Sequence, residues 1–214
     1  MTDVASLAEA LIAQPSITGA EAPAVELAAA WLRDRGWTVT LQPVGPSRAN
    51  IWASRGAGAV TLSTHLDTVP PFIGPTRTST RLAGRGACDA QGIAAAMMVA
   101  AQRLVDEGEE RVDLLLVVGE EKSSDGARAA NLLSATSRFL INGEPTEGML
   151  ASGAKGSMLV TLRTGGRAAH SAYPELGASA LAPMLALLPT LEDLELPVDA
   201  RLGRTTINIG TLHA

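Results

Sequence analysis

Residues 111–121 read RVDLLLVVGEE, and this stretch decides the fold. An apolar run bounded by charges at one end and by Gly119 at the other predicts a buried central strand over residues 111–118. Around it we predict a helix over residues 91–107 and strands over residues 59–64 and 138–142. Because strands and helices alternate in this part of the chain, we expect the α/β class with a central, mostly parallel sheet.

Further elements are predicted on both sides of this region. Two amphipathic helices open the chain. The first covers residues 3–13, and the second starts at a capping-box pattern, Thr18 to Glu21, and ends at Gly36. The other elements expected near the sheet are strands over 37–44 and 50–54 and a helix over 126–133.

The pattern changes after about residue 152. A strand is predicted over residues 155–164, a helix over 177–191 and a strand over 205–212, which is the beginning of a ferredoxin-like α+β unit. We therefore predict two domains, residues 1–153 and residues 154–214, and the second one is incomplete.

Composition excludes several classes of protein. The 214 residues are 46% apolar and 18% charged, and 17 Lys and Arg against 22 Asp and Glu leave a net charge of -5. This composition is that of a folded globular protein without a basic surface, so we expect neither a nucleic-acid nor a membrane partner. The single cysteine, Cys88, and a start without a signal-peptide pattern predict a cytoplasmic protein. The longest strongly apolar stretch, residues 93–101, is about half of the roughly 20 residues that span a bilayer.

His65 and Asp67 follow the predicted strand over residues 59–64. Two residues apart on a strand, they point to the same face, so the carboxylate can orient an imidazole whose other nitrogen binds a metal. Taken by itself the pair is more often an ordinary surface feature. Other residues must therefore support the metal interpretation.

Asp89 lies directly before the helix predicted over residues 91–107. As an isolated residue it is more often an N-cap than a ligand, because Asp is among the best N-capping residues. The same position at the carboxyl edge of a sheet can also hold a carboxylate in a site. Its neighbour Cys88 is expected to be a small buried residue rather than a zinc ligand.

Three more acids follow apolar strands. Glu120 and Glu121 come directly after the central strand, and Glu144 comes after the strand over residues 138–142. Adjacent acids at a buried strand end cost free energy unless a cation or proton compensates them. Imidazole and carboxylates without a thiolate cluster suit zinc or another divalent first-row metal in a hydrolytic site.

Five ordered motifs resemble those of the M20 metallopeptidase and deacylase family. They are STHLDTVP at 63–70, LAGRGACDAQG at 82–92, VVGEE at 117–121, INGEPT at 141–146 and GRAAHSAYPELG at 166–177. The resemblance covers nearly the whole chain. It implies a zinc-peptidase-like catalytic domain in residues 1–153 and a partial lid and dimerisation domain in residues 154–214.

The resemblance also implies roles for single residues. His65 and Glu144 would bind one zinc, Asp89 would bridge two, and Glu121 would bind the second, with cobalt or manganese as possible substitutes. In the catalytic roles, Asp67 would orient His65, Glu120 would be the general base, and His170 would reach across a homodimer to the scissile carbonyl oxygen. Ser157 would line the substrate pocket, and the peptide bond between Asp89 and Ala90 would be cis.

The chain departs from the family pattern at its end. Family members are roughly twice as long, and the last histidine ligand of the second zinc has no counterpart here, since His213 does not match it. We predict metal-dependent hydrolysis of an amide bond in N-acyl amino acids or small peptides, as in acetylornithine deacetylase. The alternative is a catalytically incomplete fragment that acts at most as a metal-binding or dimerisation module.

Overall fold

The computed structural model describes residues 3–56, 58–133 and 137–213. Its internal contacts divide the chain into two compact units, Met1–Gly148 and Met149–Ala214. The assignment of residues 1–153 to catalysis and of residues 154–214 to a lid stays a prediction. Within the described ranges, no helix is long and apolar enough to cross a membrane.

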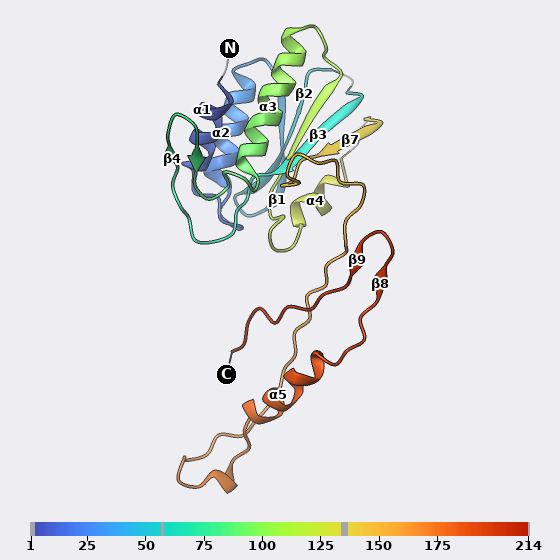
Figure 1. The fold of residues 1–214 in the computed structure, drawn as a ribbon. Coiled ribbons are helices and arrows are strands. Elements are labelled where there is room, and N and C mark those ends of the chain that lie inside the picture. The colour runs from blue at the N-terminus through green and yellow to red at the C-terminus, as the bar shows by residue number, and fades with distance from the viewer. Residues whose placement is uncertain (1–2, 57, 134–136, 214) are drawn as a thin grey trace. The chain divides into compact units, whose positions relative to one another are not determined.

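A five-stranded mixed sheet forms the centre of the first unit (Figure 1). Its order is β1, β2, β6, β3, β7, and the bounds are Thr38–Gly45 for β1, Arg48–Ser54 for β2, Val112–Val117 for β6, Val60–His65 for β3 and Phe139–Asn142 for β7. β3 lies between β6 and β7 and is parallel to both, whereas β1, β2 and β6 pair antiparallel. The predicted α/β class is confirmed, and β6 is the central strand that its apolar run predicted.

Three helices cover one face of the sheet and a fourth covers part of the other (Figure 1). On the first face lie α1 (Val4–Ile12), α2 (Ala22–Arg33) and α3 (Gln91–Asp106). Their apolar side chains pack with alternate residues of β6, Leu114 and Leu116, in one core. The opposite face carries α4 (Asp125–Ala130), which is shorter than the predicted helix over 126–133.

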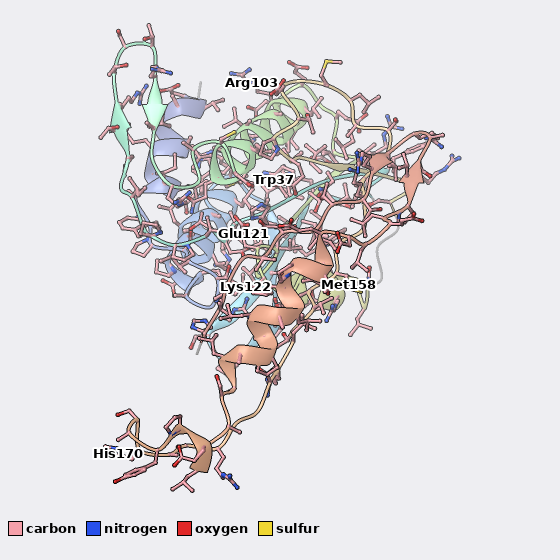
Figure 2. The ribbon with its side chains drawn as sticks, turned by 60° about the horizontal axis from the view of Figure 1, so that its bottom comes forward. Trp37, Arg103, Glu121, Lys122, Met158 and His170 are labelled. Atoms are coloured by element: carbon pink, nitrogen blue, oxygen red, sulfur yellow. The ribbon has the colours of Figure 1, made fainter. Side chains whose placement is uncertain are left out.

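Buried apolar side chains hold the helices to the sheet. Leu11, Leu32 and Met98 are fully buried, and a side chain of this size contributes about 1.5–3 kcal/mol when it leaves water. Trp37 is also buried, and its Nε1 donates to Gln102 Oε1 on α3 at 2.8 Å (Figure 2). This core makes the sheet a rigid support for the residues that follow its strands.

The predicted capping box at the start of α2 is wrong. Glu21 is the N-cap residue, but no side chain caps the helix there. Thr18 instead donates its hydroxyl to Asp67, and Glu21 accepts from Arg48. Charged partners from distant parts of the chain replace the local pairing, because a hydrogen bond to an ionised group is stronger than a neutral cap.

Two short strands of the first unit were not predicted. β4 (Thr76–Arg77) and β5 (Leu82–Ala83) pair antiparallel in a hairpin between β3 and α3. Arg77 of this hairpin forms ion pairs with Asp3 and Glu9. No helix or strand was predicted between residues 64 and 91.

The second unit contains less regular structure than its sequence predicts. Its elements are η1 (Pro174–Leu176), α5 (Leu181–Leu187), η2 (Leu188–Leu191), β8 (Val198–Asp199) and β9 (Gly203–Arg204). The strands predicted over 155–164 and 205–212 are not strands, and Met158 in the first of them is 85% exposed. Alternating apolar residues form a strand only when another strand supplies the hydrogen bonds. In the described part of this unit, β8 pairs with β9 and an isolated bridge joins Arg167 to Ala178, but neither pairing involves residues 155–164 or 205–212.

Candidate metal centre

The parallel strands bring three chain segments to one edge of the sheet. His65 is the last residue of β3 and pairs in register with Val117 of β6, while Ser63 pairs with Asn142 of β7. The residues that follow β6 and β7 therefore emerge beside His65. Glu120 and Glu144 are among them.

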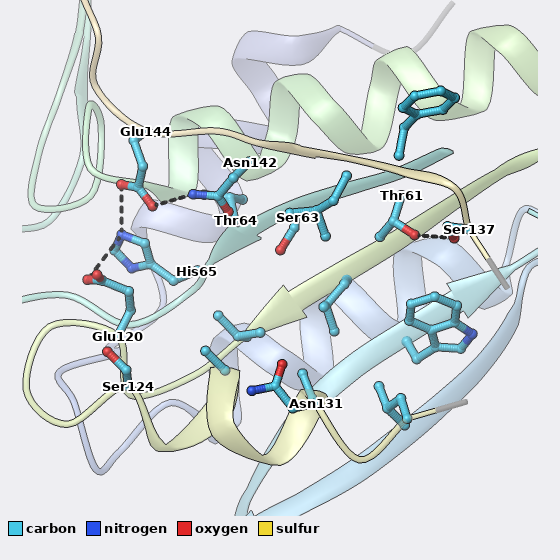
Figure 3. A pocket seen from close by; sticks show the side chains of 18 of the residues that line it. Thr61, Ser63, Thr64, His65, Glu120, Ser124, Asn131, Ser137, Asn142 and Glu144 are labelled. Atoms are coloured by element: carbon cyan, nitrogen blue, oxygen red, sulfur yellow. Dashed lines mark hydrogen bonds and ion pairs between the residues drawn. The ribbon is translucent and has the colours of Figure 1, made fainter. Parts of the chain in front are cut away.

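His65 is surrounded by carboxylates. Its Nε2 lies 2.9 Å from Asp89 Oδ1. The same atom lies 3.7 Å from Glu144 Oε2 and 3.9 Å from Glu120 Oε2 (Figure 3). The imidazole is 1% exposed, whereas the three carboxylates are between 38% and 50% exposed. The histidine is thus fixed in the protein, and the acids face a space that a ligand can enter.

The other nitrogen of His65 faces Asp67. Nδ1 lies 3.0 Å from the backbone carbonyl oxygen of Asp67 and 3.5 Å from its carboxylate Oδ1. Burial alone would lower the pKa of His65, but the hydrogen bond and charge of Asp67 and the charges of Glu144 and Glu120 outweigh it and raise the pKa to about 9. A cation is therefore strongly favoured at this position, and either a proton or a metal ion can supply the charge.

The Asp67 carboxylate ties the His65 segment to the loop after β6. Its Oδ1 accepts from the amide of Glu120 at 3.0 Å, and its Oδ2 accepts from the amide of Glu121 at 3.1 Å and from the Thr18 hydroxyl at 2.8 Å. Burial alone would raise the pKa of Asp67, but these bonds and the one with His65 lower it. Asp67 therefore stays ionised and supports both the imidazole and the two glutamates.

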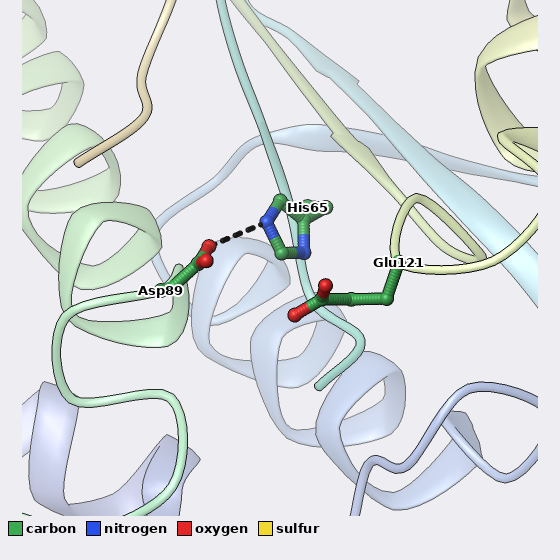
Figure 4. Close-up of side chains that lie close together, drawn as sticks. All are labelled: His65, Asp89 and Glu121. Atoms are coloured by element: carbon green, nitrogen blue, oxygen red, sulfur yellow. Dashed lines mark hydrogen bonds and ion pairs between the residues drawn. The ribbon is translucent and has the colours of Figure 1, made fainter. Parts of the chain in front are cut away.

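Ligand atoms of His65, Asp89 and Glu121 lie within 4.8 Å of one another (Figure 4). Imidazole nitrogen and carboxylate oxygens are donors that divalent first-row metals accept. Burial and the neighbouring acids raise the pKa of Glu121 and of Glu144, as expected for carboxylates crowded together without a cation. The donor set and its charge fit a bound divalent metal.

The structure thus gathers all six residues of the predicted catalytic-domain site, and the peptide bond between Asp89 and Ala90 is cis, as predicted. Cys88, which was expected to be buried, is exposed, whereas its neighbour Asp89 points toward His65 (Figure 4). The metal and catalytic roles of these residues stay predictions.

A pocket of about 620 Å³ opens beside the cluster, on the face of the sheet that carries α4. Thr61 and Ser63 of β3 line its floor, and Asn131 lines its side (Figure 3). One end is formed by His65, Glu120 and Glu144, so the carboxylates are accessible from it.

His170, Ser157 and His213 belong to the second unit, and all three are exposed. His170 lies in the turn before η1 (Figure 2). Its Nδ1 accepts from the amide of Ala172 at 3.1 Å, so the proton of a neutral ring is on Nε2. The structure does not place these three residues relative to the cluster.

Sequence reasoning missed the residues that support the site from outside. Thr18 was predicted to cap a helix. No role was predicted for Arg48 or Asn50, because both are distant in sequence from every motif. Arg48 begins the observed β2, two residues before the strand predicted over 50–54, and a charged residue that is buried needs a partner.

Two family models match the chain. The model of peptidase family M20/M25/M40 matches residues 61–181, and that of the peptidase dimerisation domain matches residues 152–214. A probable carboxypeptidase of Aspergillus clavatus is 40% identical over an alignment of 233 residues. The alignment covers 95% of this chain and 52% of the relative. A peptidase M20 domain-containing protein of Schizosaccharomyces pombe is 38% identical over 218 residues, covering 97% and 54%.

Among solved structures, a tripeptidase from Staphylococcus aureus is similar with a TM-score of 0.59 at 18% identity, over 87% of this chain and 55% of that one. At this identity the likeness shows the fold alone. The chain spans about half the length of the curated relatives it matches.

Proposed function

The chain belongs to peptidase family M20/M25/M40, and from this premise we propose that its metal centre serves the hydrolysis of amide bonds in N-acyl amino acids or small peptides. One observation carries the proposal. His65 Nε2 lies within 4 Å of carboxylate oxygens from Asp89, Glu120 and Glu144, which come from three different segments of the chain. Unrelated surface acids do not converge on one buried histidine.

Zinc is the proposed metal, with two ions per site: His65 and Glu144 would hold one, Glu121 would hold the other, and Asp89 would be shared by both. Cobalt or manganese are the possible substitutes. When bound, a divalent cation supplies Lewis-acid polarisation of the carbonyl group and stabilises negative charge on its oxygen. The histidine contributes through Nε2, because Nδ1 faces the carbonyl oxygen of Asp67. Metal binding replaces the proton that the raised pKa of His65 otherwise favours there.

Glu120 is the proposed general base. It takes a proton from the attacking water and delivers it to the leaving amine, so that the carboxylate is regenerated when the amide bond breaks. The Asp67 carboxylate accepts a hydrogen bond from the backbone amide of Glu120, which fixes the backbone there. The Glu120 side chain is 43% exposed, so a substrate can reach its carboxylate. Both properties suit proton transfer to and from a substrate.

His170 is the proposed oxyanion donor, from the partner of a homodimer formed through residues 152–214. Because its Nδ1 accepts from the Ala172 amide, its Nε2 carries the proton that the carbonyl oxygen needs. Ser157 is proposed to line the substrate pocket. Within this substrate class, acetylornithine is the first candidate substrate. Peptides with a free terminal carboxylate are the second candidate, because relatives are named probable carboxypeptidases.

Zinc titration and hydrolysis assays test this function together. Calorimetry measures zinc binding, and amine release measures turnover of acetylornithine and of N-acetylated dipeptides. Glu120→Gln is expected to retain zinc while losing at least 10²-fold in turnover, whereas Glu121→Ala is expected to lose zinc affinity. Glu26→Gln, at an exposed position of α2, is the control and is expected to change neither.

Each result has a definite reading. Retained turnover in Glu120→Gln contradicts the general-base role. Failure of the wild-type protein to bind zinc contradicts the metal centre. Zinc binding without hydrolysis of either substrate favours the alternative of a metal-binding module.

A further inference from the structure

The loop between β6 and α4 carries both adjacent glutamates of the metal centre. Glu121 and Lys122 lie on it (Figure 2). Asp67 holds the near side of the loop by accepting the amides of Glu120 and Glu121. The far side of the loop is held by residues that belong to no motif.

Arg48, the first residue of β2, connects the far side of the loop to the start of α2. Its Nη1 donates to Asp125 Oδ2 at 2.6 Å, while its Nε and Nη2 donate to the two oxygens of Glu21 at 2.9 and 2.7 Å. The Glu21 side chain is fully buried, so Arg48 cannot move away without leaving a buried charge unpaired. The planar guanidinium binds both oxygens of Glu21 and still has Nη1 for Asp125, a fork geometry that an ammonium group does not offer.

Asn50, two residues further along β2, ties both ends of the loop together. Its Oδ1 accepts from the amide of Val118 at 3.1 Å, and its Nδ2 donates to the carbonyl of Gly126 at 2.8 Å. The amide of Gly126 also donates to the carbonyl of Val118 at 3.1 Å. The loop is therefore closed at its base and attached to a strand of the sheet.

Arg48, Glu21 and Asp125 together form what we call the clamp, and Gly119 shows how closely it approaches the loop. It has a φ of +76°, and a Cβ atom there would overlap Asp125 Oδ1 and Arg48 Nη2. The Arg48–Asp125 ion pair therefore lies directly against the backbone that precedes Glu120. A shift of this pair would be transmitted to the glutamates.

We propose that Arg48, together with Glu21 and Asp125, positions the Glu120–Glu121 loop and thereby sets the metal affinity of the centre. The inference rests on the proposed function and assigns these residues a role through the loop rather than contact with the metal or the substrate. Partners that orient metal ligands typically change metal affinity by about 10- to 100-fold when they are removed.

Two variants separate positioning from charge. Asp125→Asn keeps the shape of the side chain and removes its charge. The double variant Glu21→Gln with Arg48→Gln leaves the net charge unchanged and allows the two amides to bond each other. Asp3→Asn is the matched control, because Asp3, like Asp125, lies at the start of a helix and pairs with an arginine, in its case Arg77 at 2.9 Å.

The experiment measures zinc affinity by calorimetry and amide hydrogen exchange of Glu120 and Glu121 by NMR, after circular dichroism has established that each variant is folded. We expect a Kd for zinc at least 10-fold higher, and exchange of the two amides about 10-fold faster, in Asp125→Asn and in the double variant. Asp3→Asn is expected to stay within 2-fold of wild type in both.

Unchanged zinc affinity and exchange in folded Asp125→Asn overturn the proposal, even if the melting temperature falls, because a purely structural role predicts that pattern. If the double variant does not fold, Asp125→Asn decides alone. If the wild-type protein binds no zinc, the proposed function fails, and unaltered exchange in Asp125→Asn then separately overturns the clamp.

Discussion

Replacing Thr18 by valine removes one hydroxyl group from the support of the metal centre. Thr18 Oγ1 donates to Asp67 Oδ2 at 2.8 Å, and the Asp67 side chain is fully buried. Valine has nearly the same shape and no donor. A hydrogen bond to a charged group contributes about 1.5–3 kcal/mol. Because Thr18 is itself partly exposed and water can replace part of its donation, we expect a loss of about 1.5–2 kcal/mol in the free energy of unfolding.

Urea unfolding of the whole chain, followed by circular dichroism at pH 7, measures this loss. Thr18→Ser is the matched control, because serine keeps the hydroxyl; its stability is expected to lie closer to wild type than that of Thr18→Val. If valine and serine cost the same, or if valine costs less than about 0.5 kcal/mol, the hydroxyl does not support Asp67 as argued.

The loss depends on pH with a defined sign. The folded-state pKa of Asp67 is lowered from its ordinary value of 3.8, so the ionised carboxylate stabilises the fold above that pH, and this stabilisation disappears as the pH falls through the folded-state pKa. The difference between Thr18→Val and wild type is therefore expected to be constant from pH 7 to about pH 5 and to shrink below pH 3.8. A difference that grows on acidification contradicts this assignment.

Two further predictions concern residues near the strand ends and the loop. Asp113 of β6 is buried, and its Oδ1 has no hydrogen-bond partner in the described part of the chain. Burial raises the pKa of Asp113, so its negative charge destabilises the fold as the pH rises above the unfolded-state pKa. Asp113→Asn is expected to raise the melting temperature relative to wild type more at pH 7 than at pH 3.5, and an equal shift at both would refute the charge argument. Gly119→Ala is expected to cost about 2 kcal/mol or more in urea unfolding, because of its positive φ and the overlap with Asp125. Gly74→Ala, which meets no atom within 4 Å, is the control, and a similar loss there would contradict the steric argument.

Sequence patterns predicted a helix or strand correctly where that element is stabilised mainly by its own side chains. The apolar run of β6 predicted the central strand, and apolar spacing predicted α1, α2 and α3 to within a few residues, because a helix or a buried strand is stabilised by the side chains that it contains. The five motifs were sufficient for the family, since each keeps its order and spacing along the chain.

Sequence patterns gave the wrong prediction where the local structure depends on a hydrogen-bond partner from a distant part of the chain. Thr18 and Glu21 have the spacing of a capping box, yet Asp67 and Arg48 bind them instead, because ionised partners form stronger bonds than the helix end offers. The alternating residues around Met158 read as a strand, but a strand also needs a neighbour to accept its hydrogen bonds.

By itself, the sequence determined which acids follow which strands, and thus which residues are candidates for the metal centre. Only the tertiary structure decided how they are held. The parallel register of β3 with β6 and β7 brings His65 to Glu120 and Glu144, and Arg48 fixes the loop from a strand whose sequence has no such pattern. The physical reason is that strand order and ion pairing depend on three-dimensional proximity, which spacing along the chain does not specify.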